Sequence, residues 1–172
     1  MARQLGIRVE NQIHAFLKQF DYHVLQENEM SKKFDEYING VQVRQLFGID
    51  HLIHMENTII CIQDKWTTHT ICKADASEFT VALYAIKQMY PDKRIVGIFV
   101  SKSNISVTAK ETVRLSCHNC HFIESQNYET IFSSLMNVMH SYGNYISESD
   151  NCVAMLDTES SYSIIQYQAK NI

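Results

Sequence analysis

The sequence lacks the long apolar run of a membrane protein and the long basic run of a strongly cationic protein. No apolar stretch approaches the ~20 residues that a membrane-spanning helix needs, and no signal-peptide pattern opens the chain. The five cysteines are odd in number and scattered, which suits reduced thiols rather than a disulfide framework. These absences predict a soluble intracellular protein, cytoplasmic or nuclear, that is neither secreted nor membrane-bound.

The charge balance limits how tightly the chain can hold a polyanion. The net charge is −4, and no basic run is longer than Lys32-Lys33. Residues 1–140 are close to neutral, because they hold 14 basic and 15 acidic residues. A nucleic-acid partner is therefore not excluded, but its affinity is predicted to be modest and sensitive to salt.

Length and composition indicate one folded domain followed by a tail. A chain of 172 residues with 45% apolar residues can bury a sizeable core. Residues 141–172 are rich in Ser, Tyr and Asn, carry most of the net negative charge and show no helical period. We expect a folded domain over 1–140 and a flexible acidic C-terminal tail over 141–172.

The most informative segment is a predicted β-hairpin that begins near Asp50. Two runs rich in β-branched residues are separated by Met55-Glu56-Asn57, which is turn chemistry. If the loop has two residues, Met55 pairs with Thr58, and Asp50 then lies opposite Gln63.

This hairpin brings metal-binding chemistry to one place. Side chains alternate along a strand, so Gln63 and Lys65 share one face while Asp64 points to the other. Cross-strand Cβ atoms are ~5 Å apart, so the carboxylate of Asp50, the amide of Gln63 and the ammonium of Lys65 are predicted to converge. Oxygen ligands suit Mg²⁺, and a nearby lysine can handle a water and a phosphate oxygen.

Further elements follow from hydrophobic periodicity and from capping residues. The order is helix, strand, short helix, hairpin, and then helix and strand in alternation. Besides the hairpin, we expect helices over 6–20, 31–39, 75–90, 106–116 and 127–139, and strands over 22–25, 94–100 and 120–123.

The hairpin in this succession of elements resembles the P-D-(D/E)-x-K nuclease superfamily, and most closely its Mrr-type restriction endonuclease and Holliday-junction-resolvase branches. The matching residues are Asp50 on one strand and the triplet Gln63-Asp64-Lys65 on the next, with an aromatic, Trp66, after the lysine. Gln63 departs from the acidic residue of the superfamily signature, a variant known in the Mrr-like branch. The resemblance covers residues 6–139 and implies a restriction-endonuclease-like α/β/α sandwich with a central mixed sheet.

The resemblance also implies a function. It predicts a DNA endonuclease that hydrolyses phosphodiester bonds with Mg²⁺ or Mn²⁺. Asp50, the side-chain oxygen of Gln63 and the backbone carbonyl of Asp64 would hold the metal, Glu10 would reach it through water, and Lys65 would position the attacking water. Relatives commonly dimerise to cut both strands, so the resemblance implies a homodimer. No target-recognition domain is visible, which leaves a role for a partner protein that confers specificity.

Contacts to DNA phosphates need basic side chains around this site. The candidates are scattered along the chain rather than gathered in one run. They are Lys32, Lys33, Arg44, Lys73 and Lys102.

Each candidate residue also has an ordinary structural explanation. Asp50 can hydrogen-bond a turn, Gln63 can be a surface amide, Lys65 can be a solvated strand residue, and Glu10 can be an exposed helix residue. The alternative to an enzyme is a catalytically inactive DNA-binding or assembly module on the same fold.

Cysteine and histidine also cluster outside the hairpin. The segment Cys117-His118-Asn119-Cys120-His121 has zinc-binding residue types, but no second Cys/His pair stands at finger-like spacing. Buried thiols are the favoured interpretation. His51 and His54 flank the hairpin, and packing or solvent exposure is favoured over substrate contact for both.

Overall fold

The fold is built on a five-stranded mixed sheet. The computed structural model describes residues 2–20, 24–26, 37–38, 41–42 and 48–142. The strand order is β1-β4-β5-β6-β7, with β1 and β4 antiparallel to their neighbours and β5, β6 and β7 parallel to one another. The strands are β1 (Val24–Gln26), β4 (His51–His54), β5 (Thr58–Lys65), β6 (Arg94–Ser101) and β7 (Cys120–Glu124).

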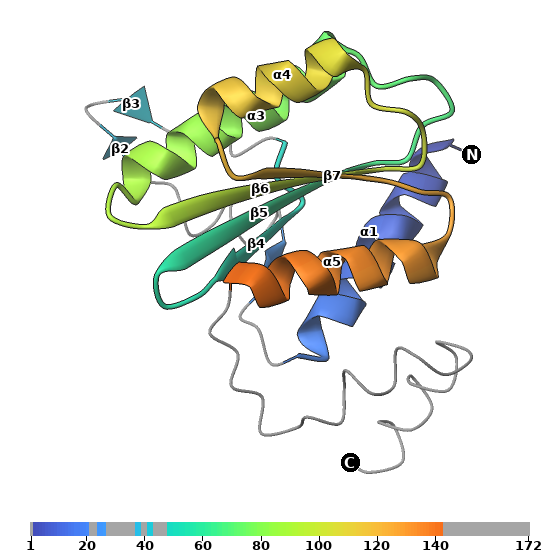
Figure 1. The fold of residues 1–172 in the computed structure, drawn as a ribbon, viewed down its shortest axis with the longest axis horizontal. Helices are drawn as coiled ribbons and strands as arrows, with labels where there is room; N and C mark the ends of the chain where they lie inside the picture. The colour runs from blue at the N-terminus through green and yellow to red at the C-terminus, as the bar shows by residue number, and fades with distance from the viewer. Residues whose placement is uncertain (1, 21–23, 27–36, 39–40, 43–47, 143–172) are drawn as a thin grey trace.

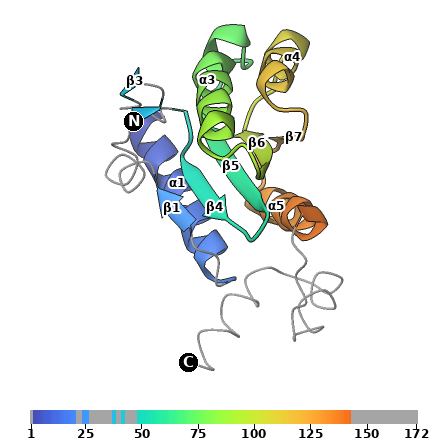
Figure 2. The ribbon, with the colours of Figure 1, turned by 90° about the vertical axis from the view of Figure 1, so that its left-hand side faces the viewer.

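Helices cover both faces of this sheet (Figures 1 and 2). One face carries α3 and α4, and the other carries α1 and α5. The helices are α1 (Ala2–Lys18), α3 (Lys73–Met89), α4 (Val107–Ser116) and α5 (Tyr128–Tyr142). The protein therefore has an α/β fold whose central sheet is flanked by helices, as an α/β/α sandwich requires.

The side chains of β5 alternate between two separate cores. Ile59 and Cys61 pack beneath α3 and α4, whereas Ile60 and Ile62 pack beneath α1 and α5. This alternation follows from the two-residue repeat of a strand, and it explains why β5 is apolar at every position from Ile59 to Ile62. By the same alternation, Gln63 and Lys65 face the layer of α3 and α4, and Asp64 faces the layer of α1 and α5.

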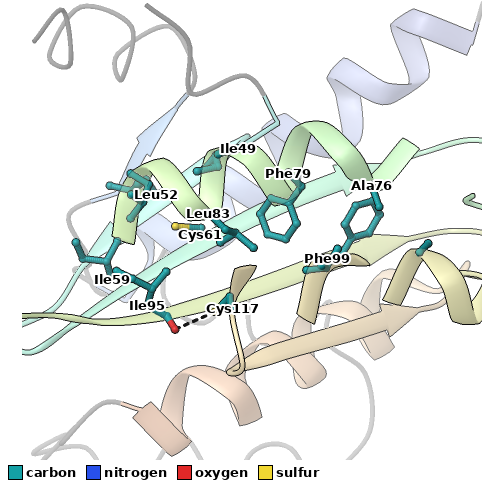
Figure 3. Packing of buried hydrophobic residues seen from close by; sticks show 14 of the residues in the cluster. Ile49, Leu52, Ile59, Cys61, Ala76, Phe79, Leu83, Ile95, Phe99 and Cys117 are labelled. Carbon is teal, nitrogen blue, oxygen red and sulfur yellow. Dashed lines mark hydrogen bonds between the residues drawn. The ribbon is translucent and has the colours of Figure 1, made fainter. Parts of the chain in front are cut away.

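The core under α3 contains the largest buried side chains (Figure 3). Phe79 of α3 meets Phe99 of β6 edge to face, with ring centroids 5.6 Å apart. Leu83 and Ile49 extend this core along α3 (Figure 3), and both are fully buried. This packing fixes α3 against the strands that carry the predicted site.

Most of the elements expected from the sequence are confirmed. The helices over 6–20, 106–116 and 127–139 correspond to α1, α4 and α5, and the strands over 22–25, 94–100 and 120–123 correspond to β1, β6 and β7. The mixed sheet is confirmed as well.

The short helix expected over 31–39 is wrong at its C-terminal end. Strand β2 (Tyr37–Ile38) pairs antiparallel with β3 (Val41–Gln42), and residues 31–36 and 39 lie outside the described residues. Tyr, Ile and Val favour strands, and the Ile38–Val41 pair leaves Asn39-Gly40 between the strands. An Asn-Gly pair between apolar residues is a strong hairpin signal that the helical expectation overlooked.

Helix α3 begins earlier than expected. Its first residue is Lys73, and the N-cap is Cys72 rather than Asp75. Asp75 stands three positions after the N-cap, where its Oδ2 accepts a hydrogen bond of 2.8 Å from the Cys72 backbone N–H. Asp75 is therefore the N3 residue of the capping box and not its N-cap, so the helix begins earlier than the sequence predicts.

None of the helices in the described part of the chain is long and apolar enough to cross a membrane. Helix α5 ends at Tyr142, and residues 143–172 of the predicted tail lie outside the described residues.

Candidate active site

The hairpin of β4 and β5 has the predicted register. Met55 N–H donates to the Thr58 carbonyl, and the pairing runs to His51 opposite Ile62. At Asp50 the ladder changes, because the Asp50 N–H also donates to the Ile62 carbonyl, at 2.8 Å. Two consecutive residues thus lie opposite Ile62, the pattern of a β-bulge, which re-aims side chains. Asp50 therefore meets Gln63 through its side chain rather than as a regular cross-strand pair.

Three polar groups converge at this bulge. Asp50 Oδ2 accepts hydrogen bonds from Gln63 Nε2 at 2.5 Å and from the Asp64 backbone N–H at 2.6 Å. Gln63 Nε2 also donates to the Asp64 carbonyl oxygen at 3.1 Å. Gln63 is only 5% exposed, so the surface-amide explanation of this residue is wrong.

This arrangement fits a cation in its donor chemistry. The Gln63 amide group, which carries partial positive charge, lies between a carboxylate oxygen and a carbonyl oxygen. A half-turn of the amide exchanges its nitrogen for its oxygen, so all three groups can offer oxygen, which hard divalent cations prefer. Among the described residues, no three His, Cys, Asp or Glu side chains are grouped to hold a metal. The predicted ligand set contains only one carboxylate side chain, that of Asp50. Its other two members are the side-chain amide of Gln63 and the backbone carbonyl of Asp64.

Lys65 lies on the same face of β5 as Gln63, two residues further along. Its side chain is 29% exposed, and Nζ stands 3.8 Å from Oε2 of Glu78 on α3, whose side chain is 64% exposed. A pair at this distance and exposure binds weakly, so Lys65 can turn toward an incoming anion at little cost. The next residue, Trp66, stacks on Tyr128 of α5 with ring centroids 5.6 Å apart.

The chain before Asp50 approaches α3 closely at Gly48. Its φ is +91°, a conformation that residues with side chains rarely adopt. A Cβ added there would lie 2.7 Å from the backbone C of Glu78 and 2.7 Å from the N of Phe79. Glycine is therefore needed for the chain to pass α3 and enter β4 at Asp50.

A second polar pair lies behind the bulge, on the face covered by α1 and α5. His51 Nε2 stands 3.4 Å from Oδ2 of Asp64, with side-chain exposures of 0% and 5%. The ring of His51 stacks on that of His14 from α1, with centroids 5.8 Å apart. Neither His51 Nε2 nor Asp64 Oδ2 has a hydrogen-bond partner within the described residues, so their mutual contact is the main compensation for burying them. His51 is thus a packed histidine, as the sequence favoured.

Glu10 lies on α1 and is half-buried. Helix α1 covers the face of the sheet opposite to the one that carries Gln63 and Lys65. Glu10 lies one helical turn before His14, whose ring stacks on that of His51. The water-mediated approach of Glu10 to a metal stays a prediction.

The basic candidates divide into two groups. Lys32, Lys33 and Arg44 lie outside the described residues. Lys73 is exposed at the start of α3, and Lys102 is half-buried just after β6. The segments beside them are joined by the Ile71–Ile105 bridge, at the end of the sheet where Lys65 stands.

Three residues in and behind this site lie outside the predicted set of site residues: Gly48, Glu78 and His51. Gly48 and Glu78 come together although thirty positions separate them, and His51 with Asp64 forms a pair behind the site. Only the glycine next to the motif carried a local signal, because glycine marks unusual backbone conformations.

Comparison with known proteins adds no family. No protein-family model matches the chain, and no curated protein matches it.

Proposed function

We propose that this protein is a metal-dependent DNA endonuclease with a restriction-endonuclease-like fold, which uses Mg²⁺ or Mn²⁺ to hydrolyse phosphodiester bonds. The observation that carries the proposal is the convergence of the Asp50 carboxylate, the Gln63 amide and the Asp64 carbonyl, with Lys65 on the same strand. This is the donor set that the resemblance to P-D-(D/E)-x-K nucleases assigns to the metal.

The roles of the residues follow from their chemistry. Asp50, the Gln63 side chain and the Asp64 carbonyl would hold the cation. A divalent cation bound there would offset the negative charge that develops on the phosphate during attack. Lys65 would orient the attacking water and stabilise the same charge through its ammonium group. Attack on phosphorus breaks one P–O ester bond and leaves a phosphate monoester and a hydroxyl.

The surroundings of the site suit a phosphate backbone. Lys73 and Lys102 flank the end of the sheet that carries Lys65, and both can contact phosphates without reading sequence. Because few basic residues are involved, we expect DNA affinity to fall with added salt, but less steeply than for a protein with many phosphate contacts.

The test compares cleavage of supercoiled, linear, branched and single-stranded DNA with Mg²⁺, Mn²⁺ or EDTA. We expect cleavage only with metal, and a loss of at least ~100-fold in Asp50→Asn and in Lys65→Ala. Lys110→Ala is the matched control for Lys65. Lys110 is 28% exposed and is also paired with a carboxylate, that of Glu124, but it lies on α4.

The control for the aspartate is Asp92→Asn, an exposed residue in the turn before β6. Cleavage at wild-type rates by Asp50→Asn or Lys65→Ala, with thermal stability unchanged, refutes the assignment of the site. DNA binding in EDTA with no cleavage in either metal refutes the enzyme and favours the inactive DNA-binding or assembly module.

A further inference from the structure

A cluster of thiols surrounds Gly97, away from the proposed nuclease site. Across the sheet, Cys61 of β5 pairs with Gly97 of β6, and Gly97 pairs with Cys120 of β7. The glycine has no side chain, and a Cβ added to it would lie 3.4 Å from Sγ of Cys120. Cys117, from the end of α4, packs in the same core as Cys61 (Figure 3).

Cys117 and Cys120 are in direct contact. They stand at the two ends of the short turn that joins α4 to β7. The Cys120 thiol donates a hydrogen bond to the Cys117 carbonyl oxygen, and its Sγ lies 2.7 Å from that oxygen. Sγ of Cys117 lies 3.2 Å from the Ile95 carbonyl oxygen (Figure 3). Two sulfurs in a Cys-x-x-Cys turn can therefore approach each other with little backbone movement.

The zinc interpretation of this segment finds no support in the described residues. They contain no group of three or more His, Cys, Asp or Glu side chains that could hold a metal, and a structural zinc site needs four ligands. All three cysteines of the cluster are free thiols.

The two sulfurs differ in reactivity. The adjacent Cys120 side chain lowers the pKa of Cys117 to about 7, helped by nearby backbone groups and the charge of Lys87, although burial opposes the shift. The pKa of Cys120 is raised by the adjacent Cys117 side chain and by partial burial, and the nearby Arg114 only partly offsets this. Burial raises the pKa of Cys61. Since the thiolate is the nucleophile, Cys117 is the reactive member.

Access differs in the opposite sense. Cys117 is 6% exposed, whereas Cys120 is partly exposed at the edge strand. The burial of Cys117 therefore holds a large oxidant away from its sulfur.

We propose that Cys117 and Cys120 form a reversible intramolecular disulfide on exposure to a small hydroperoxide, with Cys117 as the attacking thiolate and Cys120 as the resolving thiol. The thiolate of Cys117 attacks one oxygen of hydrogen peroxide, the O–O bond breaks, and hydroxide leaves and is protonated to water. The resulting sulfenic acid is then attacked by the sulfur of Cys120, whose proton leaves with the second hydroxide as water. Two thiols lose two electrons in all, and one peroxide is reduced to two waters.

The disulfide would tie the C-terminal end of α4 to the first residue of β7. A dithiol reductant would reverse it by exchange through a mixed disulfide. This inference is independent of the proposed nuclease activity, because Cys117 and Cys120 are not part of that site.

The experiment uses the full chain with Cys72→Ser and Cys152→Ser, which leaves three of the five cysteines. After hydrogen peroxide treatment, denaturation and thiol titration, we expect the count to fall from three thiols to one, and to return to three with dithiothreitol. Peptide mass analysis should show that the peptide with Cys117 and Cys120 has lost two hydrogens.

Single variants in the same background test the order of events. In Cys120→Ser, dimedone should label Cys117, because the sulfenic acid is trapped without its resolving thiol. In Cys117→Ser, Cys120 should stay reduced, and Cys61→Ala is the matched control in which the disulfide still forms. Retention of all three thiols, or dimedone on Cys120 instead of Cys117, overturns the proposal. Because the peptide analysis needs no change at Cys117, the test stands even if that variant fails to fold.

Discussion

Gly48→Ala should destabilise the fold far more than a change of one methyl group suggests. The backbone conformation at φ +91° costs a side-chain-bearing residue ~1–2 kcal/mol. The added Cβ would also lie 2.7 Å from two backbone atoms of α3, and overpacking of this kind costs ~1–3 kcal/mol. Together these effects predict a fall of ~2–5 kcal/mol in the free energy of unfolding.

Urea denaturation, followed by circular dichroism, measures this change. The matched control is Gly6→Ala, because Gly6 lies inside α1 and an added Cβ would meet nothing within 4 Å. Alanine is favoured over glycine in a helix, so we expect the control to gain ~0.5–1 kcal/mol. A Gly48→Ala variant that loses less than ~1 kcal/mol would refute the reasoning, since it would mean that the chain can pass α3 without glycine. Any DNA cleavage should fall in this variant as well, because Asp50 follows two residues later.

Three further predictions concern single side chains. Gln63→Glu should keep or raise Mg²⁺ affinity and Gln63→Ala should lower it, measured by calorimetry. Equal binding by both variants and the wild type would remove Gln63 from the ligand set. Hydrogen bonds from Cys72 lower the pKa of Asp75, so its contribution to stability is present above its ordinary pKa and lost as pH falls through the lowered value. Asp75→Asn should therefore flatten the acid side of the stability profile in urea denaturation, and an unchanged profile would contradict this. Finally, peroxide consumption by Cys117 should rise ~10-fold per pH unit below its pKa of about 7 and level off above it, whereas an ordinary thiol would keep gaining rate to about pH 8.5.

The parts of the fold that were predictable are those with a local signal. The runs Ile59–Ile62 and Ile95–Val100 are apolar at successive positions, as expected of strands buried on both faces. The register of the hairpin up to His51 followed from the turn alone. It placed Asp50 next to Gln63, although the two meet through the Asp50 side chain at a bulge and not as the cross-strand pair that the register predicts.

The remaining features depend on contacts between distant segments. The bulge at Asp50 could not be predicted from the turn, because it forms where the regular pairing of β4 with β5 ends. There the carboxylate of Asp50, and not a backbone carbonyl, accepts the hydrogen bond from the Asp64 N–H. The pair of His51 and Asp64 lies on the face of the sheet that α1 covers, where His14 of α1 stacks on His51. The sequence of the hairpin alone does not indicate which helix covers that face. The pairing of Tyr37 with Gln42 is different, because Asn39-Gly40 is a local hairpin signal in the sequence and competes there with the helical pattern over 31–39.

Asp64 has a consequence for how mutagenesis of this protein should be interpreted. Its peptide group faces Asp50 and Gln63, while its carboxylate faces His51 on the other side of the sheet. Substitution by alanine or asparagine therefore reports on the buried pair and leaves the carbonyl untouched. Replacing the amide between Asp64 and Lys65 by an ester would weaken the Asp64 carbonyl as a metal ligand, because an ester carbonyl is a weaker electron donor. It would leave the Asp64 carboxylate and its contact with His51 in place. The two chemistries, applied to one residue, would separate the stability of the sheet from the affinity for metal.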